Sequence, residues 1–225
     1  MNRGTFALIE QFMLDCMRDA AHDKEHVYRV LFNAMHIAKA EPEVEWDVLI
    51  TAALLHDVSR PEQIMDPNID HASHGADKAY AFLQERGFCT EFCEHVRQCI
   101  RTHRFRKAER PATIEAKILF DADKLDVAGA IGIARTLQYS GETGRPVYSR
   151  DVNGEVSDGT GDTKDSFFRE YKFKLEHICD HFLTKRGREL ALQRHQAAIL
   201  YYESLLTEVR DAEGREVLQT LLADV

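Results

Sequence analysis

The 225-residue sequence has little of what marks secreted or nucleic-acid-coating proteins. Cysteine is scarce: the five residues follow no regular spacing, and an odd number argues against a disulfide framework and for a reducing compartment. Basic residues are also in the minority, with 29 Lys and Arg against 38 Asp and Glu. The resulting net charge of −9 predicts no sequence-independent binding to nucleic acid phosphates.

Long hydrophobic runs are missing as well. No uninterrupted apolar stretch reaches the roughly 20 residues that a membrane-spanning helix needs. The first 20 residues carry Glu10, Asp15 and Asp19 among their apolar positions, which is unlike a signal peptide. We therefore expect a soluble, cytoplasmic protein without membrane contact. Its 44% hydrophobic and 30% charged residues are a typical globular balance, sufficient for a buried core.

Apolar residues recur at intervals of three and four along most of the chain, which is the period of amphipathic α-helices. Candidates for strand-like alternation are short and scattered. The sequence therefore predicts an all-α fold, with helices over residues 6–20, 24–41, 47–57, 70–86, 91–103, 113–139 and 167–208, and a short last helix over 215–222. Residues 140–164 break this pattern, because they are rich in glycine and poor in apolar residues, and we expect a flexible loop there.

A histidine and an aspartate stand at the end of the 47–57 helix, directly after the apolar run Leu54-Leu55. A buried carboxylate costs several kcal/mol unless it is paired or bound to a metal ion. His56 and Asp57 are therefore either metal ligands or an interior His–Asp pair. An imidazole with a carboxylate suits Mn, Fe, Co, Ni or Zn better than Ca.

Two further positions favour the metal interpretation. His26 lies on the apolar side of the 24–41 helix, although an isolated histidine there is more often a satisfied core or surface residue. Residues 121–126 place three acids within an apolar helix, where a solvated face is the usual explanation. Asp123, however, falls among apolar neighbours at helical spacing, which weakens that explanation.

The order of His26, His56-Asp57 and Asp123 resembles the HD superfamily of metal-dependent phosphohydrolases. One bacterial branch of that superfamily is similar over longer runs: His22-Asp23 with His26 and Arg29-Val30, AALLHD at 52–57, EAK at 115–117, DADKLD at 121–126 and GAIGIAR at 129–135. The resemblance covers residues 5–140 strongly and the C-terminal helices weakly. It implies an HD-type helical bundle over residues 1–139, followed by the 140–164 loop and by C-terminal helices over 165–225 packed on the same domain.

The resemblance also implies roles for individual residues. The four metal ligands of the family fall on His26, His56, Asp57 and Asp123, since the family's last aspartate is the one followed by a basic residue. Asp121 would then be structural, although spacing alone does not exclude it as a ligand. Lys124 would contact a substrate phosphate as a point charge.

Other branches with two metal ions place two more histidines between the His-Asp pair and the last aspartate. His74 and His103 stand at suitable positions, with His71 as an alternative to His74. They either hold a second ion or line the pocket as proton donors or acceptors. A basic cluster surrounds His103, and it indicates either an anionic substrate or a solvated helix end. Its members and a later arginine give three candidate substrate-binding residues: Arg104, Arg106 and Arg135.

The resemblance thus predicts a phosphohydrolase that needs a divalent ion of Mn, Fe, Co, Ni, Zn or Mg. The expected substrate is a small phosphorylated molecule, a nucleotide above all, with nucleoside triphosphate pyrophosphatase activity first and nucleoside monophosphate phosphatase activity second. The alternative from another class is a non-catalytic module that binds metal and nucleotide as a sensor. The sequence does not reveal the oligomeric state.

Overall fold

The computed structural model of the protein describes residues 1–17, 24–104, 109–214, 218 and 220–222. These residues form helices and loops, with no β-strand among them and one isolated antiparallel bridge between Arg150 and Val156. The predicted all-α fold is confirmed. No helix within the described ranges is long and apolar enough to cross a bilayer.

The chain divides into two compact units, which are described separately. The first contains residues Met1–Asp126 and His181–Leu190, and the second contains Val127–Asp180 and Ala191–Val225. The helices of the first unit are α1 (Arg3–Cys16), α2 (Lys24–Ala38), α3 (Trp46–Leu55), α4 (Arg60–Met65), α5 (His71–Glu85), α6 (Thr90–Thr102) and α7 (Ile114–Leu125). The first residues of α10 (Lys185–Asp211) also belong to it.

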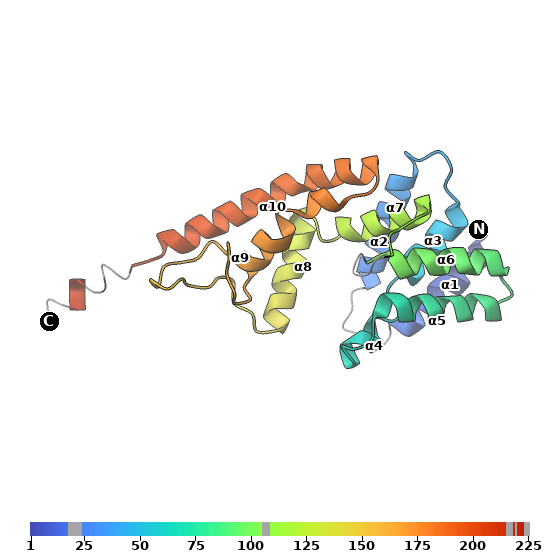
Figure 1. The fold of residues 1–225 in the computed structure, drawn as a ribbon, viewed down its shortest axis with the longest axis horizontal. Helices are drawn as coiled ribbons and strands as arrows, with labels where there is room; N and C mark the ends of the chain where they lie inside the picture. The colour runs from blue at the N-terminus through green and yellow to red at the C-terminus, as the bar shows by residue number, and fades with distance from the viewer. Residues whose placement is uncertain (18–23, 105–108, 215–217, 219, 223–225) are drawn as a thin grey trace. The chain divides into compact units, whose positions relative to one another are not determined.

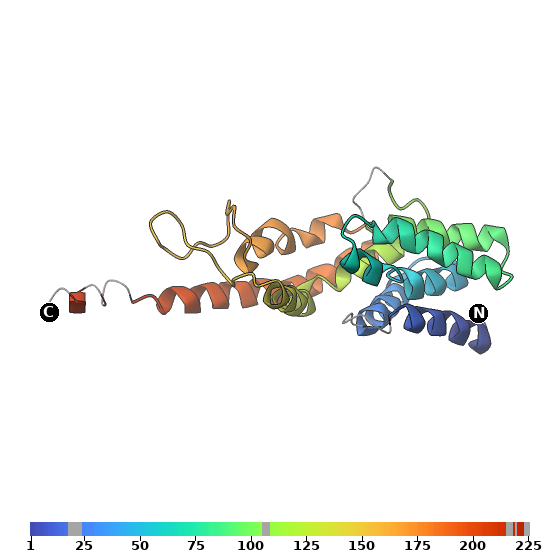
Figure 2. The same ribbon diagram turned by 90° about the horizontal axis from the view of Figure 1, so that it is seen from below.

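Helix α3 is the centre of the first unit. It contacts α1, α2, α5, α6 and α7, and Figure 2 shows it between α1 and the adjacent pair of α5 and α6. This position explains its composition, since seven of its ten residues are buried: Val48, Leu49, Thr51, Ala52, Ala53, Leu54 and Leu55. A helix that is apolar on all sides must be covered on all sides. The turn that follows it, with His56 and Asp57, therefore starts from the middle of the core.

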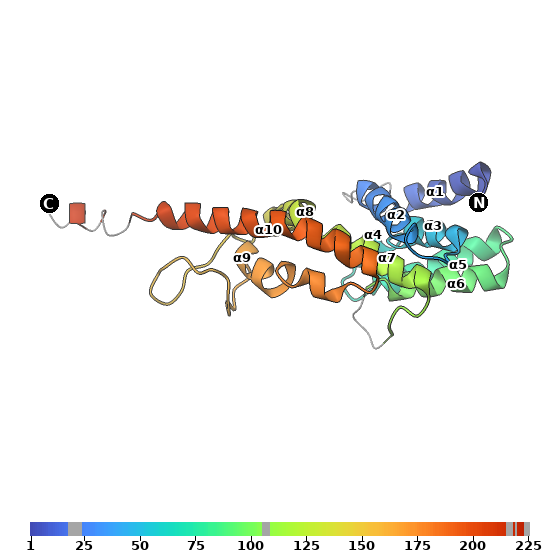
Figure 3. The same cartoon turned by 90° about the horizontal axis from the view of Figure 1, so that it is seen from above.

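The second unit contains α8 (Gly129–Glu142), α9 (Phe167–Glu170), a π-helical turn (Tyr171–Leu175), a 3₁₀ turn (Ile178–His181, whose last residue belongs to the first unit) and most of α10. Figure 3 shows α9 and the π-helical turn alongside α10. Its core contains Ile133, Val156, Phe167, Phe168, Tyr171, Leu175, Ala198 and Tyr202. Tyr171 and Tyr202 stack with ring centroids 4.0 Å apart.

The structure corrects two predicted helices. The 113–139 helix is two helices, α7 and α8, although Thr113 is its N-cap as expected and accepts from the amide of Ala116. Helix α7 ends at Leu125 and α8 begins at Gly129, whose φ of +67° is incompatible with a continuing helix and where an added Cβ would lie 2.7 Å from Cβ of Arg194. The 167–208 helix is likewise divided, since α10 begins only at Lys185.

Three other expectations concern the C-terminal part. Residues 143–166 contain no helix. Within them, the hydroxyl groups of Ser149 and Ser157 donate hydrogen bonds to the carboxylate of Asp162. The mobility of the 140–164 loop stays a prediction, as does the packing of 165–225 on the domain of residues 1–139. The expected helix over 215–222 falls largely outside the described residues.

Candidate metal centre

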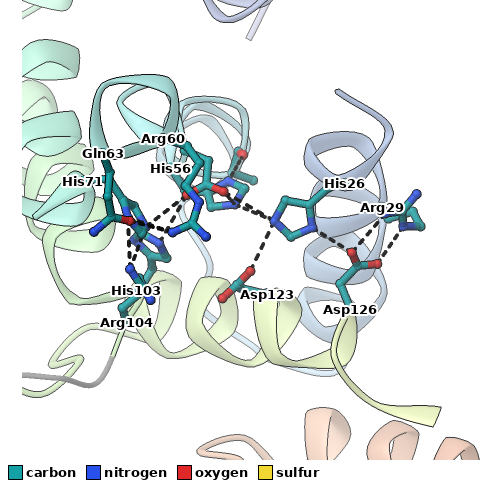
Figure 4. Close-up of polar contacts among 12 residues, drawn as sticks. His26, Arg29, His56, Arg60, Gln63, His71, His103, Arg104, Asp123 and Asp126 are labelled. Atoms are coloured by element: carbon teal, nitrogen blue, oxygen red, sulfur yellow. Dashed lines mark hydrogen bonds and ion pairs between the residues drawn. The ribbon is translucent and has the colours of Figure 1, made fainter. Parts of the chain in front are cut away.

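Four histidines and two aspartates of the first unit converge on one place (Figure 4). They come from α2, the turn after α3, the start of α5, the end of α6 and from α7: His26, His56, Asp57, His71, His103 and Asp123. Four helices and one turn that are distant in the sequence thus supply the donors. All four imidazoles are buried, with His56 at 0% exposure.

The six side chains form two groups that could each hold a metal ion. The first group contains His26, His56 and Asp123, and the second contains Asp57, His71 and His103. Within each group the candidate ligand atoms all lie within 4.8 Å of one another. Imidazole nitrogens with carboxylate oxygens are a donor set suited to Mn, Fe, Co, Ni and Zn.

Two of the histidines are oriented by the main chain of their own helices. Nδ1 of His56 lies 2.8 Å from the carbonyl oxygen of Ala53, and Nδ1 of His103 lies 2.6 Å from that of Ile100. A carbonyl can only accept a hydrogen bond, so Nδ1 carries the proton in both rings. Nε2 is then an unprotonated donor atom, which is the state that a metal ligand needs.

Side chains orient the other two rings in the same sense. Nδ1 of His26 lies 2.7 Å from Oδ2 of Asp126, and Nδ1 of His71 lies 2.5 Å from Oε1 of Gln63. The amide of Gln63 also donates from Nε2 to the carbonyl of Ile69 at 2.9 Å, which points its oxygen toward His71. Nε2 is consequently the inward nitrogen of all four histidines.

Asp57 connects the two groups through its two oxygens. Oδ2 lies 3.6 Å from Nε2 of His26 and 3.8 Å from Nε2 of His56. Oδ1 lies 3.3 Å from Nε2 of His71 and 3.8 Å from Nε2 of His103. One carboxylate therefore faces both groups, one oxygen to each, which is the arrangement of a bridging ligand.

The electrostatics of the centre favour the protonation state that metal binding requires at Asp57, Asp123, His71 and His103, and the opposite state at His26. Burial opposes ionisation of Asp57 and Asp123, but the surrounding histidines outweigh it and hold both pKa values well below the usual range. Burial lowers the pKa of His71 to about 3 and that of His103 to about 4. Burial also acts against protonation of His26, yet hydrogen bonds to Asp123 and Asp126 raise its pKa to about 9. A bound cation would replace that proton.

Comparisons with known proteins agree with this geometry. Residues 24–128 match the HD domain family. The protein YpgQ of Bacillus subtilis is 30% identical over 195 residues, which are 84% of this chain and 85% of YpgQ. The chain belongs to the HD-domain family. The matched residues include all six converging side chains, from His26 to Asp123, so the whole centre lies within the HD domain.

Solved structures show the same HD fold. An HD-superfamily hydrolase from Bacillus thuringiensis has a TM-score of 0.72 at 27% identity, over 94% of this chain and 99% of that one. A crystal structure of YpgQ in complex with ADP has a TM-score of 0.68 at 28% identity, over 89% of this chain and 97% of that one. Membership of a family of hydrolases follows from these similarities.

The four predicted ligands lie together, and four other candidates belong to the described part of the same unit: His74, His103, Arg104 and Lys124. His71 is the α5 histidine in the second group, whereas Nδ1 of His74 contacts Oγ of Ser59. Arg104 places a guanidinium nitrogen 3.0 Å from Nδ1 of His71. Lys124 follows Asp123 on α7, with Nζ 4.3 Å from the ring centroid of Phe120.

The two other predicted substrate-binding residues are arginines outside the described part of the first unit. Arg106 lies outside the described residues, and Arg135 lies on α8 of the second unit.

Arg60 and Gln63 of α4 contact His71, although the sequence did not predict a role for them. Arg60 donates from Nη1 to Oε1 of Gln63 at 2.6 Å and lies 3.2 Å from Nδ1 of His71. Both follow closely after the His-Asp pair, and Pro61 in the first turn of α4 is the one sequence feature that indicates a helix there. Such a short helix has no periodicity that could reveal which of its side chains turn inward.

Proposed function

We propose that this HD-domain protein is a divalent-metal-dependent phosphohydrolase that acts on a nucleotide. The observation that carries the proposal is the convergence of four inward Nε2 atoms on two ionised aspartates. Nδ1 of each ring has its own hydrogen-bond partner, and Nε2 of each ring lies 3.3–3.8 Å from a carboxylate oxygen of Asp57 or Asp123. Nε2 of His26 and of His56 are 3.3 Å apart, a separation that a shared cation explains.

The first ion would be held by His26, His56, Asp57 and Asp123. A second ion would be held by His71 and His103, with Asp57 shared between the two. The geometry supports this second candidate through the position of Asp57, whose oxygens face one group each. The other interpretation leaves His71 and His103 as pocket-lining groups without an ion.

When bound, the divalent ion would lower the pKa of a water molecule and neutralise charge on the phosphoryl oxygens. The chain itself supplies the cations around the second group. Arg60 and Arg104 both approach Nδ1 of His71, at 3.2 and 3.0 Å, and their charge favours an anionic substrate at that side of the centre. We assign Lys124 a phosphate contact from the side of α7.

A proton donor for the leaving group is a further requirement. Burial lowers the pKa of His103 to about 4, which favours the neutral ring of a metal ligand over a proton donor. His74 is the remaining candidate, and its contact with Ser59 would orient its ring.

The nucleotide assignment is supported by YpgQ, whose crystal structure in complex with ADP has the same fold. We propose hydrolysis of nucleoside triphosphates to monophosphate and pyrophosphate as the activity, with nucleoside monophosphate phosphatase activity second. The competing proposal is a sensor that binds metal and nucleotide without turnover.

The test is a panel of nucleotides incubated with purified protein and added Mn²⁺ or Co²⁺, with pyrophosphate and phosphate measured separately. We expect His56→Ala to abolish turnover, whereas His177→Ala, which removes a histidine with 59% side-chain exposure in the second unit, should leave it unchanged. Absence of cleavage despite tight nucleotide binding would support the sensor. Elemental analysis of the metal-loaded protein and of its His71→Ala variant counts the ions. A fall from two ions to one would support the second site, whereas one ion in both proteins would leave His71 as a pocket-lining group.

A further inference from the structure

Asp126 lies at the end of α7 and is completely buried, at 0% exposure, yet it is not one of the six converging donors. Its Oδ2 lies 2.7 Å from Nδ1 of His26 and accepts from Nη2 of Arg29 at 3.1 Å. Its Oδ1 accepts from Nε of Arg29 at 2.7 Å. Figure 4 shows the three side chains in a row, with Asp126 between the imidazole and the guanidinium.

We infer that Asp126 is a positioning residue for metal binding: held by Arg29, it keeps His26 in the tautomer whose Nε2 faces the ion. This inference rests on the proposed metal-dependent function. The nitrogen of a histidine that binds a metal is determined by the hydrogen bond that the other nitrogen makes. An ionised carboxylate only accepts, so it fixes the proton on Nδ1 and increases the basicity of Nε2.

The spacing of both helices supports this role. His26 and Arg29 are three residues apart on α2, and Asp123 and Asp126 are three residues apart on α7, so each pair shares a helix face. The ring of His26 therefore lies between two carboxylates one helical turn apart. Asp126 contacts its Nδ1 at 2.7 Å, and Oδ1 of Asp123 lies 3.4 Å from its Nε2.

Arg29 makes the carboxylate a fixed rather than a mobile acceptor. Its planar guanidinium donates through Nε and Nη2 to both oxygens, and such a two-point contact restricts rotation of the carboxylate. It also offsets the cost of burying the charge of Asp126. Nδ1 of His56 and of His103 is instead held by a main-chain carbonyl, which no substitution removes. His26 is thus a ligand whose orientation depends on a replaceable charged side chain.

The inference is tested by titrating the full-length protein with Co²⁺ alone, following the visible absorption of the bound ion and its dissociation constant. We expect Asp126→Ala to weaken Co²⁺ binding by about 10- to 100-fold, the usual loss for a residue that orients a metal-ligating histidine. Arg29→Gln should weaken it in the same direction by less. Asp126→Asn, which keeps one acceptor oxygen, should lie between Asp126→Ala and the unmodified protein.

The matched control is Asp77→Ala. Asp77 also accepts from Nε and Nη2 of an arginine, Arg97, but it is exposed and belongs to neither group of candidate ligands. It should leave Co²⁺ binding unchanged. Thermal unfolding without metal is measured in parallel, since a purely structural Arg29–Asp126 pair would lower that stability while leaving the affinity of the folded protein intact.

The outcomes separate the inference from the function on which it rests. If the unmodified protein binds no Co²⁺, the proposed metal centre itself is wrong. If the unmodified protein binds Co²⁺ and folded Asp126→Ala binds it with the same affinity and absorption spectrum, the positioning role is overturned. Should Asp126→Ala fail to fold, Asp126→Asn and Arg29→Gln decide the matter by the same criterion, because each retains a polar group at its position.

Discussion

Asp121 offers a test of how the first unit is held together. Its carboxylate is fully buried and accepts from the amide of Leu183 at 2.8 Å, the amide of Thr184 at 2.7 Å and Oγ1 of Thr184 at 2.6 Å. Oγ1 of Thr184 in turn accepts from the amide of Gly187 at 3.0 Å. One side chain of α7 thus supplies acceptors to the main chain just before α10.

Asp121→Ala removes all three of these hydrogen bonds at once. A buried donor left without an acceptor costs about 1–3 kcal/mol, so the two amides alone predict a loss of roughly 2–6 kcal/mol. Water entering the vacated space will satisfy part of this demand, so we expect the lower half of that range, about 2–4 kcal/mol. Asp121→Asn keeps one acceptor oxygen and should cost about half as much.

The measurement is the free energy of unfolding from urea titrations monitored by circular dichroism. Asp165→Ala is the control, because Asp165 is about half exposed and its contacts with Arg145 and Arg169 are surface ion pairs worth about 0–1 kcal/mol. Co²⁺ binding by folded Asp121→Asn should persist, because Asp121 belongs to neither donor group. A loss below about 0.5 kcal/mol for Asp121→Ala would refute the reasoning.

Three further predictions concern other positions. Gly187→Ala should destabilise the protein, as shown by a lower urea midpoint, because the new Cβ would lie 2.5 Å from the Asp121 carboxylate. Lys124→Ala should retain the metal but lose turnover by on the order of 30- to 1000-fold, or about 2–4 kcal/mol, in nucleotide assays; full activity would exclude its phosphate contact. At pH 8, iodoacetamide should alkylate exposed Cys89 well before Cys99, whose pKa burial raises to about 12, as mass spectrometry of peptides would show.

Four helices of the first unit could be predicted closely because their apolar residues recur at helical spacing or, in α3, form a continuous buried run. The ends of the 24–41, 47–57, 70–86 and 91–103 predictions fall within three residues of α2, α3, α5 and α6. The break between α7 and α8 was not predicted, because apolar residues recur at helical spacing on both sides of it. Only the structure reveals the φ of +67° at Gly129 and its approach to Arg194, 65 positions away in the sequence.

The residues of the metal centre could likewise be predicted only in part. His26, His56, Asp57 and Asp123 could be selected from their motifs, and the structure brings these side chains together. The choice between His71 and His74 could not be made, because the two lie three residues apart on one face of α5. Contacts from other elements distinguish them: Gln63 orients His71 toward Asp57, whereas Ser59 contacts His74.

The three acids of residues 121–126 show that a run of charged residues on a helix can make buried contacts rather than form a solvent-exposed face. Successive residues of a helix are rotated by about 100°, so Asp121 points away from Asp123, while Asp126 comes back to within about 60° of it. Asp121 accordingly contacts the main chain before α10, and both Asp123 and Asp126 contact the ring of His26. A shift of α7 that disturbed the first contact would also move the other two carboxylates. The same helix therefore couples the stability of the first unit to the geometry of the proposed metal site, and an Asp121 variant that unfolds more easily should also lose bound metal at lower urea concentrations.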